Sequence, residues 1–159
     1  MNKALALLLS VIVLSGYNVP LDTGQVLIHN PSFDEYHGQA LITFSYDDGY
    51  RSIYDNALPL HEKYKIPATF NIIASYIGLN PERHMDKKMI LDAHNRGIEI
   101  ASHSYYHNDW LTNKTDEEVH FEFGESKRIL SGIVGEINTV AIPFSQYDDR
   151  VMEIAKEYY

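Results

Sequence analysis

Residues 39–49 read QALITFSYDDG, a β-prone and largely apolar run that ends abruptly at two aspartates and a glycine. The partial alternation of apolar and polar residues predicts a strand over Gln39–Tyr46. Gly49 permits the tight turn, with a positive φ, that such an abrupt end requires. The stretch therefore predicts a strand that delivers two carboxylates to a turn.

The rest of the chain alternates between helix-like and strand-like segments. Apolar residues at helical spacing, or a capping signal such as TDEE at 115–118, predict helices over 53–64, 86–96, 115–131 and 148–158. Further strands are expected at 68–73, 98–101 and 140–142. Strands that alternate with crossover helices run parallel, so the pattern predicts an α/β fold. A complete eight-stranded α/β barrel usually needs about 200 residues or more, so we expect a small open sheet or the front part of a barrel.

Composition limits the class of protein. The 159 residues, of which 45% are apolar, suffice for one domain with a hydrophobic core. With 13 basic and 22 acidic residues the net charge is −9, a poor match for nucleic acid or for an anionic membrane. The absence of cysteine excludes disulfides, Cys-ligated zinc, iron–sulfur clusters and thiol nucleophiles. A neutral or cationic polymer remains compatible with this charge, and nucleic acid is not an expected partner.

The N-terminal residues have the pattern of a targeting segment. A lysine at position 3 precedes an apolar run over 4–14, interrupted only by Ser10, and two small residues follow it. This pattern predicts a secretory signal over 1–16, since a membrane-spanning helix needs roughly 20 apolar residues. A buried N-terminal helix is the alternative. The signal implies a secreted, periplasmic or cell-envelope protein that contacts the membrane only through an uncleaved signal. After the signal we expect a linker and N-terminal extension over 17–38 and a domain over 39–159.

Three loops with polar side chains follow predicted strands. They read DDG at 47–49, HSYYH at 103–107 and PFS at 143–145. The carboxyl ends of parallel strands lie on one face of an α/β fold, and active sites assemble there. We therefore expect the three loops to converge in space.

The residue types in these loops indicate a metal site. His103 and His107 are four residues apart, and one helical turn would place both on the same face of a helix, able to bind one ion. Two histidines and one carboxylate leave open positions on the metal, as a catalytic zinc site requires. The second of the two carboxylates, Asp47 or Asp48, is then free to take a proton from metal-bound water. The alternatives are surface histidines and a simple DDG turn.

Several stretches together resemble a known family. LITFSYDDGY at 41–50 resembles the first motif of the polysaccharide deacetylases (the NodB-like carbohydrate esterases), usually written TFDDG. IEIASHSYYH at 98–107 resembles their second motif, H-[ST]-x-x-H, and VAIPFS at 140–145 resembles their third. The resemblance extends from Gln39 to Tyr159. It implies an incomplete (β/α) barrel of the polysaccharide deacetylase type, with parallel strands and crossover helices, whose later motifs lie beyond residue 159.

The resemblance also implies roles for individual residues. Asp47 corresponds to the catalytic base, and the ligands of a divalent metal, most often zinc, correspond to Asp48, His103 and His107. Ser104 corresponds to a residue that hydrogen-bonds behind the ligands, and Phe144 to the position whose backbone N–H helps to hold the oxyanion. The aromatic residues beside these motifs are expected to line a sugar groove: Tyr50, Tyr105 and Tyr106.

The activity that this implies is metal-dependent hydrolysis of N-acetyl groups on an amino-sugar polysaccharide, such as peptidoglycan, a chitin-like polymer or poly-N-acetylglucosamine. The sequence departs from the family at two places: Ala141 and Ile142 stand where an arginine commonly orients the base, and Ser145 replaces a glycine.

Three other classes remain open. A degenerate module that binds metal or glycan without turnover is compatible with the missing C-terminal motifs. A two-histidine, one-carboxylate iron oxygenase uses the same ligand types, and a purely structural protein would leave the three polar loops unexplained. The histidines outside the HSYYH motif are not expected to be ligands: His120 in a helix, and at the surface His29, His37, His61, His84 and His94.

Overall fold

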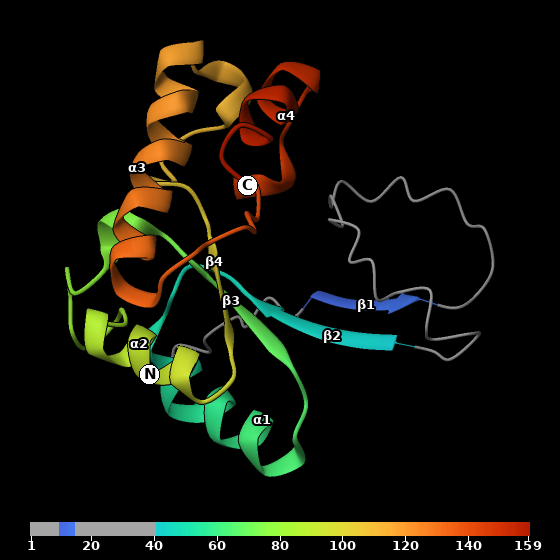
Figure 1. Ribbon diagram of the computed structural model, residues 1–159, viewed down its shortest axis with the longest axis vertical. Coiled ribbons are helices and arrows are strands. Elements are labelled where there is room, and N and C mark those ends of the chain that lie inside the picture. The colour runs from blue at the N-terminus through green and yellow to red at the C-terminus, as the bar shows by residue number, and fades with distance from the viewer. Residues whose placement is uncertain (1–9, 15–40) are drawn as a thin grey trace, which may run out of the picture.

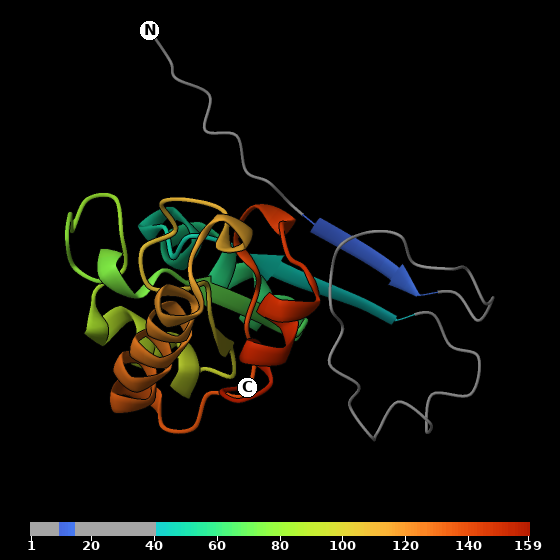
Figure 2. The same cartoon turned by 90° about the horizontal axis from the view of Figure 1, so that it is seen from above.

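The computed structural model describes residues 10–14 and 41–159. Its sheet has the strand order β1-β2-β3-β4. β2 (Leu41–Tyr46), β3 (Ala68–Ile72) and β4 (Glu99–Ser102) pair in parallel, whereas β1 (Ser10–Leu14) pairs with β2 in the antiparallel direction. β1 and β2 extend away from the helices side by side (Figures 1 and 2). The parallel strands confirm the predicted α/β class.

Helices connect successive parallel strands. α1 (Leu58–Tyr64) follows β2, α2 (Lys87–Asn95) follows β3, and α3 (Asp116–Val134) follows β4. α3 packs against α2, β4 and the short α4 (Asp149–Ala155), and Figure 2 shows α3 and α4 adjacent. The predicted capping box is present, because the Thr115 hydroxyl accepts a bond from the Glu118 N–H and the Glu118 carboxylate accepts one from the Thr115 N–H. Within residues 10–14 and 41–159, no helix combines the length and apolarity needed to cross a membrane.

Two predicted elements differ in detail from the structure. The helix expected over 53–64 begins as a π-helical turn, Ile53–Ala57, before α1. The strand expected over 140–142 is reduced to one parallel bridge between Val140 and Ser102. Pro143, which has no N–H to donate, starts a 3₁₀ turn there and ends the pairing.

The N-terminal predictions are only partly covered by the structure. β1 comes from within the predicted signal, 1–16, while the linker expected over 17–38 lies outside the described residues. The signal therefore stays a prediction.

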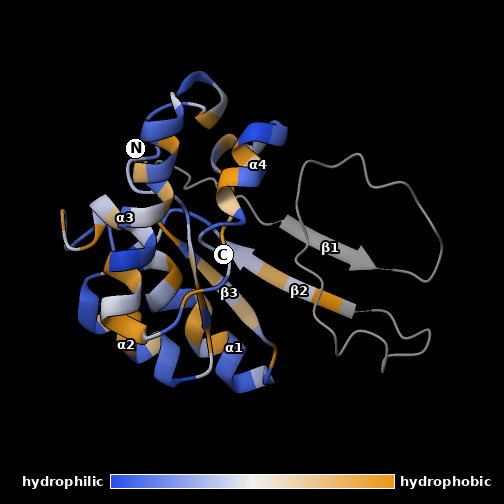
Figure 3. Cartoon of the chain, turned by 45° about the horizontal axis from the view of Figure 1, so that its top comes forward, coloured by the Kyte–Doolittle hydropathy of each residue, from blue (hydrophilic) through white to orange (hydrophobic). Residues whose placement is uncertain are grey.

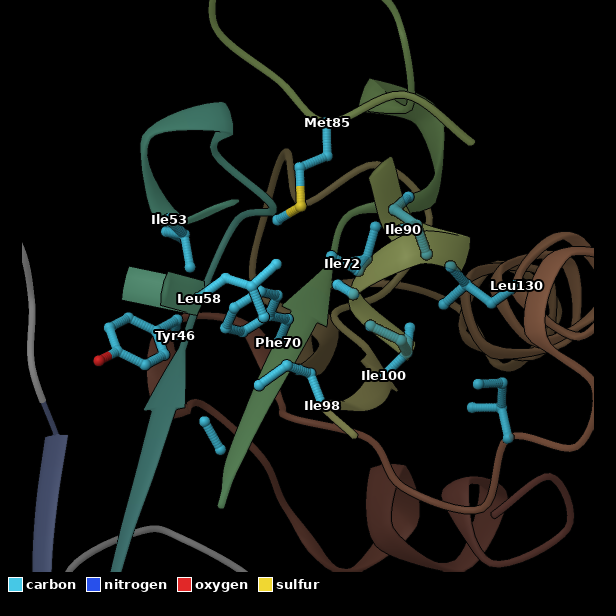
Figure 4. Close-up of a cluster of buried hydrophobic side chains, with 13 residues drawn as sticks. Tyr46, Ile53, Leu58, Phe70, Ile72, Met85, Ile90, Ile98, Ile100 and Leu130 are labelled. Atoms are coloured by element: carbon cyan, nitrogen blue, oxygen red, sulfur yellow. The ribbon is translucent and has the colours of Figure 1, made fainter. Parts of the chain in front are cut away.

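The main core lies between the sheet and helices α1 and α2. Figure 4 shows Leu58 of α1, Phe70 of β3 and Ile98 gathered there, all less than 5% exposed. In Figure 3 the apolar residues concentrate where β3 faces these helices, and the outer helical turns are hydrophilic. A second cluster joins α3 to α4 through Phe123 and Val151. These helices are held by amphipathic packing, which supplies most helical stability in proteins of this size.

The opposite face of the sheet is polar. Alternate residues of β3, Thr69 and Asn71, point to it, and the Thr69 hydroxyl donates to Glu99 Oε2 at 2.6 Å. The Thr139 hydroxyl donates to the other oxygen of the same carboxylate at 2.8 Å. The period of two along β3 thus separates an apolar, helix-facing side from a polar side that leads to the carboxyl edge.

Two of the histidines expected at the surface are in fact buried. His61 is 7% exposed, with Nε2 2.8 Å from the Tyr46 hydroxyl and Nδ1 2.9 Å from the Ile66 carbonyl oxygen. His84 is 5% exposed, and its ring packs against those of Tyr50 and Tyr76. The prediction failed because an imidazole with partners for its nitrogens, or with aromatic neighbours, is tolerated in a core. His94 is exposed as expected, and His29 and His37 lie outside the described residues.

Replacing a core leucine of α1 should destabilise the protein strongly. Leu58→Ala removes a fully buried side chain and is expected to lower the free energy of unfolding by about 2–5 kcal/mol, through lost burial and the cavity left behind. Leu60→Ala, in the same helix but 54% exposed, should change it by less than about 0.5 kcal/mol. Urea unfolding of the two variants checks this, and equal losses would contradict the assignment of the core.

Candidate metal centre

Three side chains converge at the carboxyl edge of the sheet. Asp48 follows β2, and His103 and His107 follow β4; one potential ligand atom from each lies within 4.8 Å of the other two. Asp48 Oδ1 is 3.7 Å from Nε2 of each histidine. The two imidazole ring centres are 4.7 Å apart. Two of the three polar loops therefore meet as expected.

The DDG turn sends its two carboxylates in different directions. Asp48 and Gly49 both have left-handed backbone conformations, with φ of 71° and 66°. A Cβ at Gly49 would lie 3.2 Å from Ile72 Cδ1, so a side chain would be strained there both by φ and by space. The turn directs Asp48 toward the histidines, while the Asp47 carboxylate contacts Asn71 of β3.

The histidine pair does not lie on a helix, contrary to the expectation from its spacing. Residues 103–107 form a loop in which Ser104 and His107 have φ values of 64° and 52°. The buried Ser104 hydroxyl accepts a hydrogen bond from the His107 N–H at 3.2 Å. A tight left-handed loop thus brings the rings together, and its backbone strain is of the kind that persists where surrounding contacts hold it.

The orientation of His103 is set by a backbone carbonyl. Its Nδ1 lies 2.8 Å from the Ala141 oxygen, which can only accept, so Nδ1 carries the proton and donates it. Nε2, on the side of Asp48, then keeps its lone pair for a metal. Burial lowers the pKa of His103, which favours the neutral imidazole that binds metal. The third polar loop therefore contributes to the site through the Ala141 carbonyl that precedes it.

A buried carboxylate holds the loop between the histidines. Glu122 of α3 is 1% exposed, and its Oε2 accepts bonds from the N–H groups of Tyr105 and Tyr106, both at 2.8 Å. Its Oε1 forms an ion pair with Lys114 Nζ at 3.2 Å, but the angles between the two groups do not allow a hydrogen bond. Sequence analysis missed Glu122, although an acidic residue beside Val119 and Phe123 on the inward face of the helix was the available signal.

The predicted base also has a partner that the sequence did not reveal. Asn71, 3% exposed on β3, donates from Nδ2 to Asp47 Oδ1 at 2.6 Å and to Ser45 Oγ at 2.7 Å. Asn71 lies in ATFNI, which reads as an ordinary buried strand. Only the parallel pairing of β2 with β3 makes the contact.

The predicted aromatic residues take different positions. Phe144 has a φ of 57°, and its half-exposed ring lies 4.4 Å, centre to centre, from that of His107. Tyr106 is 45% exposed and belongs to a cluster with Tyr105 and Phe121. Tyr50 instead packs against His84, and the Arg83 guanidinium lies 5.5 Å from its ring centre. Phe144 and Tyr106 therefore lie near the histidine loop, while the contacts of Tyr50 are with the 83–84 segment.

The donor set fits a divalent metal. It comprises one carboxylate and two imidazoles, one of them fixed in its tautomer by a hydrogen bond behind it, as is usual for metal-ligating histidines. Three protein ligands leave positions open for water and substrate. Fold and site together define an α/β protein with a cluster able to hold a divalent metal at the carboxyl edge of its parallel strands.

The chain belongs to the polysaccharide deacetylase family, whose model matches residues 34–159. It is 27% identical over 128 residues to the poly-β-1,6-N-acetyl-D-glucosamine N-deacetylase of Staphylococcus aureus, a match that covers 73% of this chain and 44% of that protein. Among solved structures, the Streptococcus pyogenes deacetylase PplD in complex with acetate superposes with a TM-score of 0.65 and 26% identity, over 72% of this chain and 50% of PplD.

A pseudoenzyme of carbohydrate esterase family 4 from Bacillus anthracis has the same fold, with a TM-score of 0.62 and 18% identity, over 72% of this chain and 39% of the pseudoenzyme. The chain spans less than half the length of the curated relative named above. Membership of the family thus establishes the fold and the kind of protein, while the activity of this chain depends on its own residues.

Removing the Glu122 carboxylate should weaken metal binding. Glu122→Ala frees the Tyr105 and Tyr106 N–H groups and loosens the loop that carries both histidines, so zinc affinity should fall about 10- to 100-fold. Glu117→Ala, an exposed change on the same helix, should leave the affinity within about twofold. Calorimetric zinc titration measures both, with circular dichroism as a check of folding. Equal affinities in the two variants would show that Glu122 does not support the site.

Proposed function

We propose that this chain removes N-acetyl groups from an amino-sugar polysaccharide by metal-dependent hydrolysis. The observation that carries the proposal is the DDG turn, in which Asp48 joins His103 and His107 in one ligand cluster while the adjacent Asp47 stays outside it. A ligand carboxylate and a free carboxylate side by side are what metal-assisted hydrolysis with a general base requires.

Each proposed role follows from the position of the residue. Asp48, His103 and His107 would hold a divalent ion, and one carboxylate with two imidazoles is a donor set that suits zinc. When bound, zinc supplies Lewis acidity that polarises a carbonyl and makes water more acidic. Asp47 would take the proton from the attacking water, through the oxygen that Asn71 leaves free. The N–H of Phe144, a residue whose ring lies beside that of His107, would donate to the oxyanion that develops on the acetamide.

The substrate class is inferred from the surroundings of the cluster. The half-exposed Tyr106 and Phe121 rings are nearly parallel, with centres 6.0 Å apart, and offer flat surfaces of the kind that pack against sugar rings. The family and the named activity of the Staphylococcus aureus relative favour a polymer of N-acetylglucosamine, with peptidoglycan or a chitin-like chain as the other members of this class. Export through the segment 1–16 would place the protein where such polymers occur.

Replacing the proposed base should abolish most turnover without loss of metal. Asp47→Asn keeps the size of the side chain but cannot accept the proton, so acetate release should fall about 10²- to 10⁴-fold. Zinc affinity should stay within a few-fold, because Asp47 lies outside the ligand cluster. Acetate released from β-1,6- and β-1,4-linked N-acetylglucosamine oligomers, measured with zinc present, checks the expectation.

His103→Ala serves as the matched control, since it should lose both zinc binding and acetate release. An Asp47→Asn variant as active as the wild type would refute the base assignment. A wild-type chain that binds zinc and oligomer but releases no acetate would be a binding module, the other function considered from the sequence.

A further inference from the structure

Asn71 is a buried side chain on the polar face of β3. It is 3% exposed, and its sequence neighbours Phe70 and Ile72 point to the opposite face, into the main core. Burying an amide is unfavourable unless its hydrogen bonds are satisfied. Its Nδ2 donates to Ser45 on the adjacent strand and to Asp47 in the turn after it.

The register of the sheet creates this arrangement. Tyr46 of β2 pairs with Phe70 of β3, and residues 45 and 47 flank position 46 on the opposite face of the strand. Asn71, one residue beyond Phe70, therefore faces both. A carboxylate can only accept hydrogen bonds, so the amide nitrogen and not the amide oxygen must face Asp47. The bond to Asp47 Oδ1 is short, at 2.6 Å.

Within the described part of the chain, Asp47 has no cationic side chain beside it to hold its carboxylate, so its orientation depends on the contact with Asn71. Among residues 41–159, no lysine or arginine nitrogen lies within salt-bridge distance of the Asp47 carboxylate. Position 141 on the neighbouring loop is an alanine and not an arginine, and its backbone carbonyl orients His103. The side chain that fixes Asp47 is thus a neutral amide held by the sheet.

We propose that Asn71 is a positioning residue for Asp47, an inference that rests on the proposed function. By holding Oδ1, the amide fixes the rotation of the carboxylate and leaves Oδ2 to accept the proton of the attacking water. The Ser45 hydroxyl accepts the second hydrogen bond from Asn71 Nδ2, which keeps the plane of the amide in place. Asn71 would therefore act on the rate of the chemical step rather than on binding of metal or polymer.

The test compares Asn71→Leu, which has the same branched shape but no hydrogen-bond donor, with Asn71→Gln, which keeps the amide. Asn71→Leu should lower kcat about 10- to 100-fold, the size expected for loss of one hydrogen bond to a charged group. KM and zinc affinity should stay within about twofold. Asn71→Gln should recover part of the rate, and Ser45→Ala, which spares the bond to Asp47, should lose less than about fivefold.

Measuring Asn71→Leu both in the wild-type chain and in an Asp47→Asn chain separates positioning of Asp47 from a general effect on folding. If Asn71 acts through Asp47, Asn71→Leu should cause little further loss in the residual acetate release of Asp47→Asn. The same fold loss in both backgrounds, or an unchanged kcat in Asn71→Leu, would overturn the proposal. Should Asn71→Leu fail to fold, Asn71→Ala takes its place: a loss of kcat confined to the chain that has Asp47 would support the proposal, and an unchanged kcat or an equal loss in both backgrounds would overturn it. A wild-type chain without acetate release would instead refute the proposed function itself.

Discussion

The parallel pairing of β2, β3 and β4 is the constraint on which the rest of the site depends. It brings the turn after β2 and the loop after β4 to the same edge, although Asp48 and His103 are more than fifty residues apart in the sequence. The same pairing gives β3 an apolar face toward α1 and α2 and a polar face toward the carboxyl edge. The core and the polar residues of the site therefore lie on opposite faces of one sheet, and the helices that bury the apolar face fix the positions of the residues on the polar face.

Two of the three residues in the cluster, and two residues beside it, have a backbone conformation that is costly to maintain. Asp48, Ser104, His107 and Phe144 all have positive φ values without being glycine. Residues in such conformations persist where neighbouring contacts hold them in place. In this protein those contacts are polar and mostly buried: the Ser104 hydroxyl, the Ala141 carbonyl and the Glu122 carboxylate. The strained loop and its polar supports form one unit, so the site should be more sensitive to changes in those supports than to changes at exposed positions nearby.

Much of the fold and of the cluster could be predicted from local patterns. The alternation of strands and helices, and the capping box at Thr115, depend on short-range periodicity and were found. The helical interpretation of the pair at 103 and 107 was wrong, because i,i+4 spacing is compatible with any backbone that curls back on itself. The burial of His61 and His84 was also missed, since composition carries no information about which imidazole finds partners in the core.

The sequence by itself determined which reactive side chains are present and which strands they follow. It showed strands ending in DDG and HSYYH, an acidic chain without cysteine, and motifs that resemble one family. These features are local, so side-chain type and spacing suffice to reveal them. Only the tertiary structure decided which oxygen or nitrogen faces which partner: that Ala141 orients His103, that Glu122 holds the loop, and that Asn71 binds Asp47. These contacts join residues 16 to 38 positions apart across strands and helices, and their strength depends on angles and burial that no local pattern encodes.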